Sequence, residues 1–252
     1  MIASSARKSS ACDAPVIPRA GELHLWLRRR ETAAGSDALL REVLSRYTHG
    51  APAQLQFTRG VNGKPALAAP PAALEFNLSD SGDWLAMVVS GGAPVGIDLE
   101  YCDPGRDVLK LARRCFSAAE LADLQACTIA GRSARFYDYW TLKEAHIKAA
   151  GGSLGRELEA TVFALEYPVQ AAGDTAIGSI VQLAPQPAQS AWYCLVQALE
   201  HYRLALCCSA VPGASPGLRL FEFTNTGAIL ERNPALSAVS AGPCHSPRAT
   251  CQ

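Results

Sequence analysis

The stretch VGIDLE, residues 95–100, sets two acidic residues at alternate positions among apolar ones. Alternation predicts a strand, in which side chains two residues apart share a face. Asp98 and Glu100 therefore project together, while Ile97 and Leu99 turn into the core. Two neighbouring carboxylates repel each other unless a cation lies between them, and Mg²⁺ bound through oxygen is a natural occupant. Taken alone, the pattern is more typical of an ordinary solvated strand face.

A second stretch, WTLKEAHIK at residues 140–148, has helical spacing. Trp140, Glu144 and Lys148 are each four residues apart and form one stripe on a helix. A third carboxylate and a cation are therefore neighbours. The same Glu–Lys spacing is common on solvated helix faces, but a tryptophan on that stripe is unusual there.

The remaining pattern predicts an α+β fold, because strands and helices occur in runs along the chain. Helices are predicted over residues 36–47, from Ser117 with Glu120 completing a capping box, and over 133–150 up to Gly151-Gly152. Gly91-Gly92 predicts a hairpin between two of the strands. The predicted strands are 22–27, 74–78, 84–90, 94–101, 161–167, 177–183, 192–199 and 202–210.

Composition excludes several classes of protein. Lys plus Arg and Asp plus Glu number 23 each, so the near-zero net charge favours neither nucleic acid nor an anionic membrane as partner. No apolar run reaches the length of a membrane span, and the N-terminus lacks the apolar core of a secretory signal. The nine cysteines contain no C-x-x-C pair. Their spacing fits neither a zinc site nor a disulfide framework, and reduced thiols indicate a cytoplasmic protein.

The two stretches, in this order, resemble the motifs of the 4′-phosphopantetheinyl transferases of the surfactin-synthetase-activating type. That family carries G-[IV]-D-x-E on a strand and, downstream, [FW]-x-x-K-E-[AS]-x-x-K on a helix. The flanking stretches RGVNGKP (59–65), FNLSDSGDW (76–84) and CFSAAE (115–120) are similar to the family as well. The resemblance runs from about residue 22 to 210, and the W-x-x-K-E-A spelling resembles the broad-acting subgroup.

The resemblance implies a fold of two similar α/β halves related by a pseudo-twofold axis, with coenzyme A in the cleft between them. On that pattern we expect a disordered start at 1–20, an N-terminal half at 21–103, a C-terminal half at 104–211 and a loose tail at 212–252. The first half looks shortened. The subgroup is usually monomeric and serves the carrier proteins of fatty-acid, polyketide and peptide synthetases.

The resemblance also implies roles for the acidic residues. Asp98, Glu100 and Glu144 would hold Mg²⁺, although Mn²⁺ accepts the same oxygen ligands. The serine of an acyl or peptidyl carrier protein would attack the phosphate attached to pantetheine, and 3′,5′-ADP would leave. The family uses a carboxylate or a metal-bound water as the base; Glu144 is the candidate here, with Glu120 as a helper.

Basic and small residues complete the implied site. Lys148 would stabilise charge on the leaving phosphate or donate a proton to it. Lys143 would assist with phosphate binding or with substrate positioning. The three residues Gly63, Lys64 and Pro65 would lie against the adenine nucleotide. Ser79 matches a family residue that contacts phosphate.

Two departures from the family pattern bear on activity. Asp80 stands where family members usually have a histidine near the 3′-phosphate of coenzyme A, and an acid there should repel the phosphate. The connection after Trp26, residues 27–36, is also short: a family segment of roughly 25 to 30 residues with basic side chains has no counterpart. The run Arg28-Arg29-Arg30 would supply part of that charge, or would be a solvated basic run.

Two other functions fit the same residues. One is a non-catalytic or weakened relative that binds coenzyme A or a carrier protein. The other is an Mg²⁺-dependent phosphohydrolase, which would need no carrier serine. Lys110, Arg113 and Arg114 are candidates for a basic patch toward acidic carrier helices, although their pattern is more typical of an ordinary exposed helix face.

Overall fold

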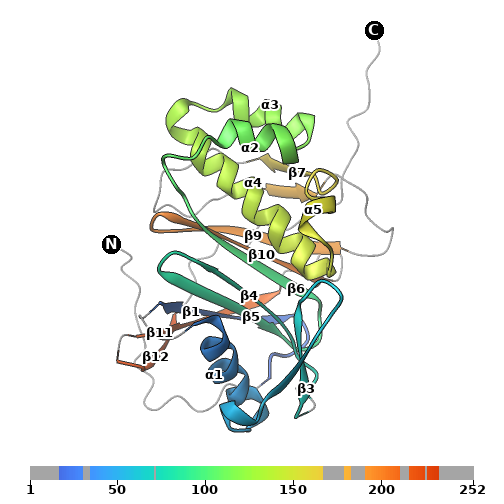
Figure 1. Ribbon diagram of the computed structural model, residues 1–252, viewed down its shortest axis with the longest axis vertical. Helices are drawn as coiled ribbons and strands as arrows, with labels where there is room; N and C mark the ends of the chain where they lie inside the picture. The colour runs from blue at the N-terminus through green and yellow to red at the C-terminus, as the bar shows by residue number, and fades with distance from the viewer. Residues whose placement is uncertain are drawn as a thin grey trace.

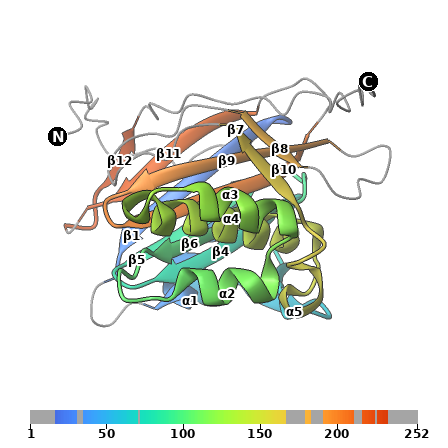
Figure 2. The same ribbon diagram turned by 90° about the horizontal axis from the view of Figure 1, so that it is seen from above.

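The computed structural model describes residues 17–30, 35–70, 72–166, 179–182, 191–210, 216–224 and 226–232. Most of the N-terminal segment expected to be disordered, residues 1–16, lies outside this part of the chain. The described elements stack as four layers in the order helix, sheet, sheet, helices (Figures 1 and 2). Among the described residues, no helix combines the length and apolar content that a membrane crossing requires.

The first sheet has five strands. Their spatial order is β12 (Ile229–Arg232), β11 (Gly217–Phe223), β1 (Glu22–Arg29), β5 (Trp84–Ser90) and β4 (Glu75–Ser81). Helix α1 (Ser36–Thr48) covers its outer face. The buried side chains of α1 follow the predicted helical stripe: Leu39, Leu40, Val43, Leu44 and Tyr47. A 3₁₀ turn, η1 (Pro52–Gln54), leads to the small hairpin of β2 (Gln56–Arg59) and β3 (Pro65–Ala69).

The second sheet has three strands in the order β6 (Val95–Tyr101), β10 (Tyr202–Ala210) and β9 (Ala191–Leu199). Helix α4 (Ile129–Ala150) packs on β6 and β10, with α2 (Val108–Cys115) and α3 (Ala118–Ala126) on its far side. Because α4 is enclosed on two sides, its apolar residues are not confined to one stripe. The short elements α5 (Leu154–Glu157), β7 (Phe163–Glu166) and β8 (Ser179–Gln182) follow.

Two predicted helix ends are confirmed. The N-terminus of α3 has the capping box, in which the Ser117 side chain accepts a hydrogen bond from the backbone N–H of Glu120 and the Glu120 carboxylate accepts one from that of Ser117. Helix α4 ends at Gly151, which adopts the left-handed conformation with φ of 71°.

The two halves of the fold repeat one arrangement of strands. Strands β1, β4 and β5 pair in the order β1-β5-β4, and β6, β9 and β10 pair in the order β6-β10-β9. In each half a helix, α1 or α4, follows the first strand. The repeat agrees with the expected α+β fold of two similar halves.

Strand pairing shows how the chain continues after β5. Strand β6 pairs with β10 rather than with β5. The predicted Gly91-Gly92 hairpin is therefore wrong, and the chain passes from the first sheet to the second in the loop 91–94. The two glycines still reverse the chain, but they carry it from one sheet to the other.

The prediction of a loose tail from residue 212 is wrong for residues 217–223 and 229–232. Strand β11 pairs in parallel with β1, and β12 pairs with β11. The pairing is stabilised by Phe221, which stacks on Trp26 with ring centroids 4.5 Å apart. The sequence hid this strand because Pro, Gly, Ser and Cys dominate the residues around it.

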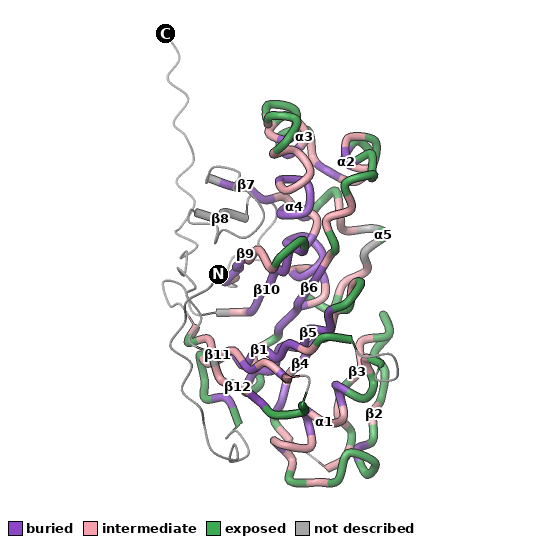
Figure 3. Tube along the Cα trace, turned by 90° about the vertical axis from the view of Figure 1, so that its left-hand side faces the viewer, coloured by how far each residue is buried: buried purple, intermediate pink, exposed green. Residues whose placement is uncertain are grey.

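The alternation of VGIDLE is confirmed. Val95, Ile97 and Leu99 are buried between the two sheets, where they pack with Leu25 of β1. Burying such an aliphatic side chain contributes about 1.5–3 kcal/mol. Figure 3 shows buried segments concentrated along β5, β6, β10 and α4. The opposite face of β6 is left with Gly96, Asp98 and Glu100.

Strands β4 and β6 are the neighbouring edges of the two sheets, and side chains of β4 connect them. Asn77 Oδ1, Ser79 Oγ and Ser81 Oγ accept hydrogen bonds from the backbone N–H groups of residues 97, 99 and 101 of β6 at 2.9, 3.1 and 2.9 Å. These three bonds, here called the β4–β6 seam, satisfy donors that would otherwise be exposed at a sheet edge.

Helix α4 lies unusually close to β6 at Gly96. A Cβ atom at this position would lie 2.1 Å from the carbonyl oxygen of Ala145 and 2.5 Å from the backbone nitrogen of Ala149. Both are backbone atoms of a buried helix, so neither can move aside easily. The absence of a side chain at Gly96 therefore sets the distance between α4 and the acidic face of β6.

Gly96→Ala should destabilise the protein by about 1–3 kcal/mol, because the added methyl group pushes α4 off β6. Urea denaturation would measure the loss. Gly60→Ala is a matched control, since its Cβ would meet nothing closer than 3.7 Å. Equal stability of the two variants would contradict the close approach.

Candidate active site

Three carboxylates meet where α4 crosses β6. Asp98 and Glu100 come from β6 and Glu144 comes from α4, and one oxygen atom from each lies within 4.8 Å of the others. The two stretches singled out in the sequence are therefore brought together. Gly96 permits this, because it lets the helix approach the strand closely enough for Glu144 to reach the strand carboxylates.

The surroundings of Asp98 fit a bound cation. Its side chain is buried, and its Oδ1 atom accepts hydrogen bonds from Ser79 Oγ at 3.0 Å and Lys148 Nζ at 2.5 Å. Its Oδ2 atom is buried without a hydrogen-bond partner among the described residues. An unsatisfied buried acceptor is costly, and three oxygen donors are the ligand type that Mg²⁺ prefers.

The electrostatics of the cluster also favour a cation. Burial, together with the Asp98 and Glu100 charges, raises the pKa of Glu144 to about 7, although Lys148 opposes the shift. Burial and the Asp98 charge likewise raise the pKa of Glu100. Burial alone would lower the pKa of Lys148, but Asp98 and Glu144 outweigh it and raise that pKa. The single ammonium does not offset three carboxylates.

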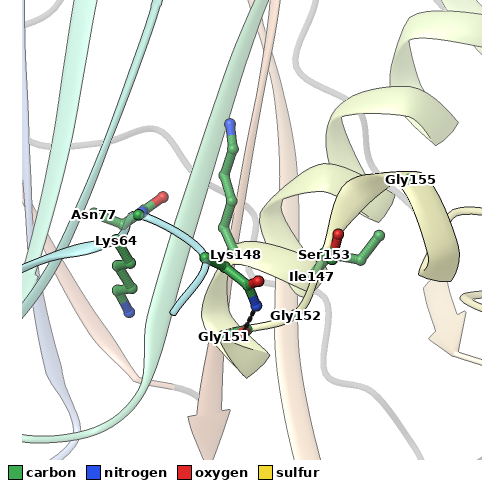
Figure 4. Close-up of a pocket in the computed structure, with 10 residues that line it drawn as sticks. Lys64, Asn77, Ile147, Lys148, Gly151, Gly152, Ser153 and Gly155 are labelled. Atoms are coloured by element: carbon green, nitrogen blue, oxygen red, sulfur yellow. Dashed lines mark hydrogen bonds between the residues drawn. The ribbon is translucent and has the colours of Figure 1, made fainter. Parts of the chain in front are cut away.

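A cleft of about 450 Å³ opens beside the cluster. Figure 4 shows Lys64 and Asn77 on one side of it and Lys148, Gly151 and Gly152 on the other. The complete lining is Asn62, Gly63, Lys64, Asn77, Ile147, Lys148, Gly151, Gly152, Ser153 and Gly155. Lys148 belongs to both the cleft and the carboxylate cluster, so a ligand in the cleft can reach the acidic centre.

The loop of RGVNGKP forms one wall of this cleft. Lys64 Nζ donates to Glu75 Oε2 at 3.3 Å and to the carbonyl of Val95 at 3.2 Å. Asn62 Nδ2 donates to the carbonyl of Gly151 at 2.7 Å, which ties the loop to the end of α4. Pro65 begins β3 and does not line the cleft. Ser79 lies on the cluster rather than in the cleft wall.

Glu120 and Lys143 lie elsewhere, and their surroundings revise the expected roles. They form an ion pair of 2.7 Å in which both side chains are fully buried. Lys143 Nζ also donates to the carbonyls of Leu158 and Thr161, both at 2.6 Å. An ammonium has three donors, so none is left for a phosphate. Glu120 accepts from the backbone of Ser117 and of residue 163, and it is not part of the acidic cluster.

Asp80 is paired rather than exposed as a bare charge. Its carboxylate accepts hydrogen bonds from Arg30 and, at 3.2 Å, from Ser36 Oγ. Arg30 lies in the short connection between β1 and α1. The other two arginines of the basic run form ion pairs with Glu42 and Glu200.

Several residues of the site had escaped the sequence analysis. Asn77 lines the cleft, and Ser81 donates to Glu100 Oε2 at 3.5 Å. Arg106, in the loop after β6, lowers the pKa of Glu100 through its charge, against the larger effect of burial. A signal for the first two was present: in FNLSDS every second residue is polar, so Asn77, Ser79 and Ser81 share one face of β4.

The sequence is similar to those of the 4′-phosphopantetheinyl transferases. The family described as the 4′-phosphopantetheinyl transferase superfamily matches residues 94–207. A 4′-phosphopantetheinyl transferase of Bacillus subtilis is 32% identical over 184 residues, 73% of this chain and 76% of that protein. The 4′-phosphopantetheinyl transferase HetI of Nostoc sp. is 34% identical over 172 residues, 67% of this chain and 72% of that protein.

Among solved structures, the similarity is partial. A holo-(acyl-carrier-protein) synthase from Bacillus anthracis, in complex with CoA (3′,5′-ADP), matches with a TM-score of 0.38 and 14% identity. The match covers 47% of this chain and 96% of that one. Such a likeness is too low to indicate function, and the sequence relatives carry the assignment.

Lys143→Met should destabilise the fold by about 3–5 kcal/mol, because it leaves the Glu120 carboxylate buried without its cation. Urea denaturation would measure this, with Lys110→Met on the exposed face of α2 as the control. Unchanged stability in Lys143→Met, together with weaker binding of coenzyme A, would restore the phosphate-binding role.

Proposed function

This chain belongs to the 4′-phosphopantetheinyl transferase superfamily, and we propose that it transfers the 4′-phosphopantetheine group of coenzyme A to a serine of a carrier protein. The acceptor is an acyl or peptidyl carrier protein, and 3′,5′-ADP is released. The observation that supports this best is the meeting of Asp98, Glu100 and Glu144 beside a cleft that shares Lys148 with them. Both family motifs contribute to that centre.

Asp98, Glu100 and Glu144 would hold the metal ion, for which Mg²⁺ is proposed and Mn²⁺ is the alternative. The unpartnered Oδ2 of Asp98 is a free ligand atom, while its Oδ1 is already engaged by Ser79 and Lys148. When bound, such an ion neutralises charge on phosphoryl oxygens and orients them.

The protein side chains then serve one displacement at phosphorus. The serine oxygen of the carrier forms a bond to the phosphorus attached to pantetheine, and the bond from that phosphorus to the 3′,5′-ADP oxygen breaks. The serine proton passes to Glu144, the candidate base, whose carboxylate lies in the acidic cluster. Lys148, whose ammonium stays charged, stabilises the negative charge that develops on the leaving phosphate.

The cleft supplies binding for the nucleotide. Gly63 and Lys64 on one wall and Lys148 on the other bring backbone and ammonium groups toward an anionic ligand. Ser79 would act on phosphate indirectly, through Asp98, because its hydroxyl donates to that carboxylate.

Asp80 and the short segment 27–36 bear on affinity rather than on chemistry. Arg30 neutralises part of the Asp80 charge, which reduces the repulsion expected for a nearby phosphate. A weakened relative is accordingly the competing outcome of the activity test.

The natural partner follows from the subgroup. We place the chain in the broad-acting, surfactin-synthetase-activating type, as a cytoplasmic monomer that serves fatty-acid or secondary-metabolite carrier proteins. Lys110, Arg113 and Arg114 are exposed on α2 and would face an acidic carrier helix.

Incubation of the protein with an apo carrier protein, coenzyme A and Mg²⁺ should add one phosphopantetheine to the carrier. Intact-mass spectrometry would detect the gain, and EDTA should abolish it. Glu144→Gln should lower the rate at least about 100-fold while leaving the fold intact, because it removes the base and a charged ligand.

Three results would contradict this account. No mass gain with several carriers would indicate the weakened relative. Turnover of coenzyme A without a carrier would indicate a phosphohydrolase. A near-normal rate in Glu144→Gln would remove Glu144 from the mechanism.

Asp80→His should tighten coenzyme A binding, since it replaces a negative charge with a side chain that can donate to a phosphate. Isothermal titration calorimetry would give the dissociation constant. Asp80→Asn is the control, because it removes the charge without adding a cation. An unchanged constant in Asp80→His would mean that the nucleotide does not reach this part of β4.

A further inference from the structure

We propose that the buried Arg203–Asp138 ion pair is a positioning device, which fixes α4 along β6 so that Glu144 reaches Asp98 and Glu100. The inference rests on the metal site proposed above, and it concerns two residues outside that site. Neither residue belongs to the sequence motifs that carry the family resemblance.

The pair joins α4 to the strand beside the cluster. Arg203 lies on β10, directly opposite Glu100 of β6 in the pairing register. Its Nε atom donates to Asp138 Oδ1 of α4 at 2.8 Å, and both side chains are 5% exposed. The ion pair therefore connects the helix that carries Glu144 to the position on the sheet that carries Glu100.

A second fixed point lies at the other end of the cluster. Gly96 of β6 touches the backbone of α4 at Ala145 and Ala149. Asp98 lies on β6 between Gly96 and Glu100, and Glu144 lies on α4 between Asp138 and Ala149. The close approach and the ion pair thus hold the helix at two points, with the three carboxylates between them.

The metal ligands must be positioned more precisely than an apolar contact between α4 and the sheet would allow. Sliding a helix by one residue moves its side chains about 1.5 Å along the axis, whereas metal ligands must lie within about 0.2 Å of ideal distances. Apart from the Lys148–Asp98 ion pair, which belongs to the acidic cluster itself, α4 packs through apolar side chains such as Leu142 and Ala145. Apolar contacts of this kind are non-directional, whereas a charged hydrogen bond between two side chains forms at only one position of the helix along the strand.

The burial of the pair supports the same conclusion. A buried ion pair is often no more stabilising than an apolar pair of similar size, because both charges lose their hydration. Its presence here is therefore better explained by the alignment that it enforces. The Asp138 carboxylate is itself engaged by Arg203 and is not one of the three clustered ligands.

The test compares metal affinity with stability in the full-length protein. Asp138→Leu/Arg203→Met replaces the pair with apolar side chains, and Arg219→Met/Glu231→Leu does the same to the ion pair of β11 and β12, far along the chain from the acidic cluster. Mn²⁺ affinity would be measured by electron paramagnetic resonance without coenzyme A or carrier, and Tm by calorimetry. We expect the first double variant to keep its Tm but to bind Mn²⁺ at least tenfold more weakly, while the control keeps both.

Other outcomes would overturn the inference. If the parent binds Mn²⁺ and the folded double variant binds it within threefold as tightly, the pair does not position the ligands, and the transferase proposal stands. If the parent itself shows no Mn²⁺ binding, the metal site fails and this inference fails with it. If the double variant does not fold, Arg203→Lys keeps the charge without the planar fork, and parental Mn²⁺ affinity in that variant would overturn the proposal.

Discussion

The direct contact of the α4 backbone with β6 at Gly96 is the constraint on which the rest of the acidic centre depends. A helix held off by even one methyl group would carry Glu144 away from Asp98 and Glu100. The approach also buries the cluster, and burial raises the pKa of Glu144. The absence of a side chain at Gly96 thereby influences the electrostatics of the three carboxylates.

Much of the acidic centre was predictable because it depends on the spacing of residues within single strands and helices. The period of two in β6 and the period of about four in α4 identify which side chains share a face. Their order along the chain, together with the family resemblance, predicted that Asp98, Glu100 and Glu144 would meet. The capping box at Ser117 and the glycine that ends α4 were predictable for the same reason, since each depends on a few neighbouring residues.

The errors concern pairings between distant parts of the chain. Nothing local distinguishes a turn that closes a hairpin from one that passes between sheets, so the strands flanking Gly91 were joined wrongly. Likewise, nothing in the local sequence identifies β11 as a strand, because it is stabilised by a distant residue, Trp26, on which Phe221 stacks. The family resemblance implied that Lys143 assists with phosphate binding or substrate positioning. On a helix, however, adjacent residues point about 100° apart, and Lys143 turns into the core, where Glu120 and two carbonyls use its donors.

The β4–β6 seam couples the association of the two sheets to ligand binding at the acidic centre. Ser79 and Ser81 each accept a backbone hydrogen bond from β6, and each donates to a clustered carboxylate, Asp98 or Glu100. A ligand that orders these carboxylates therefore also tightens the junction of the sheets. By thermodynamic reciprocity, a change that loosens the junction lowers the affinity for the ligand by the same factor. Although the two halves repeat one arrangement of strands, they bind a ligand at the acidic centre as one unit.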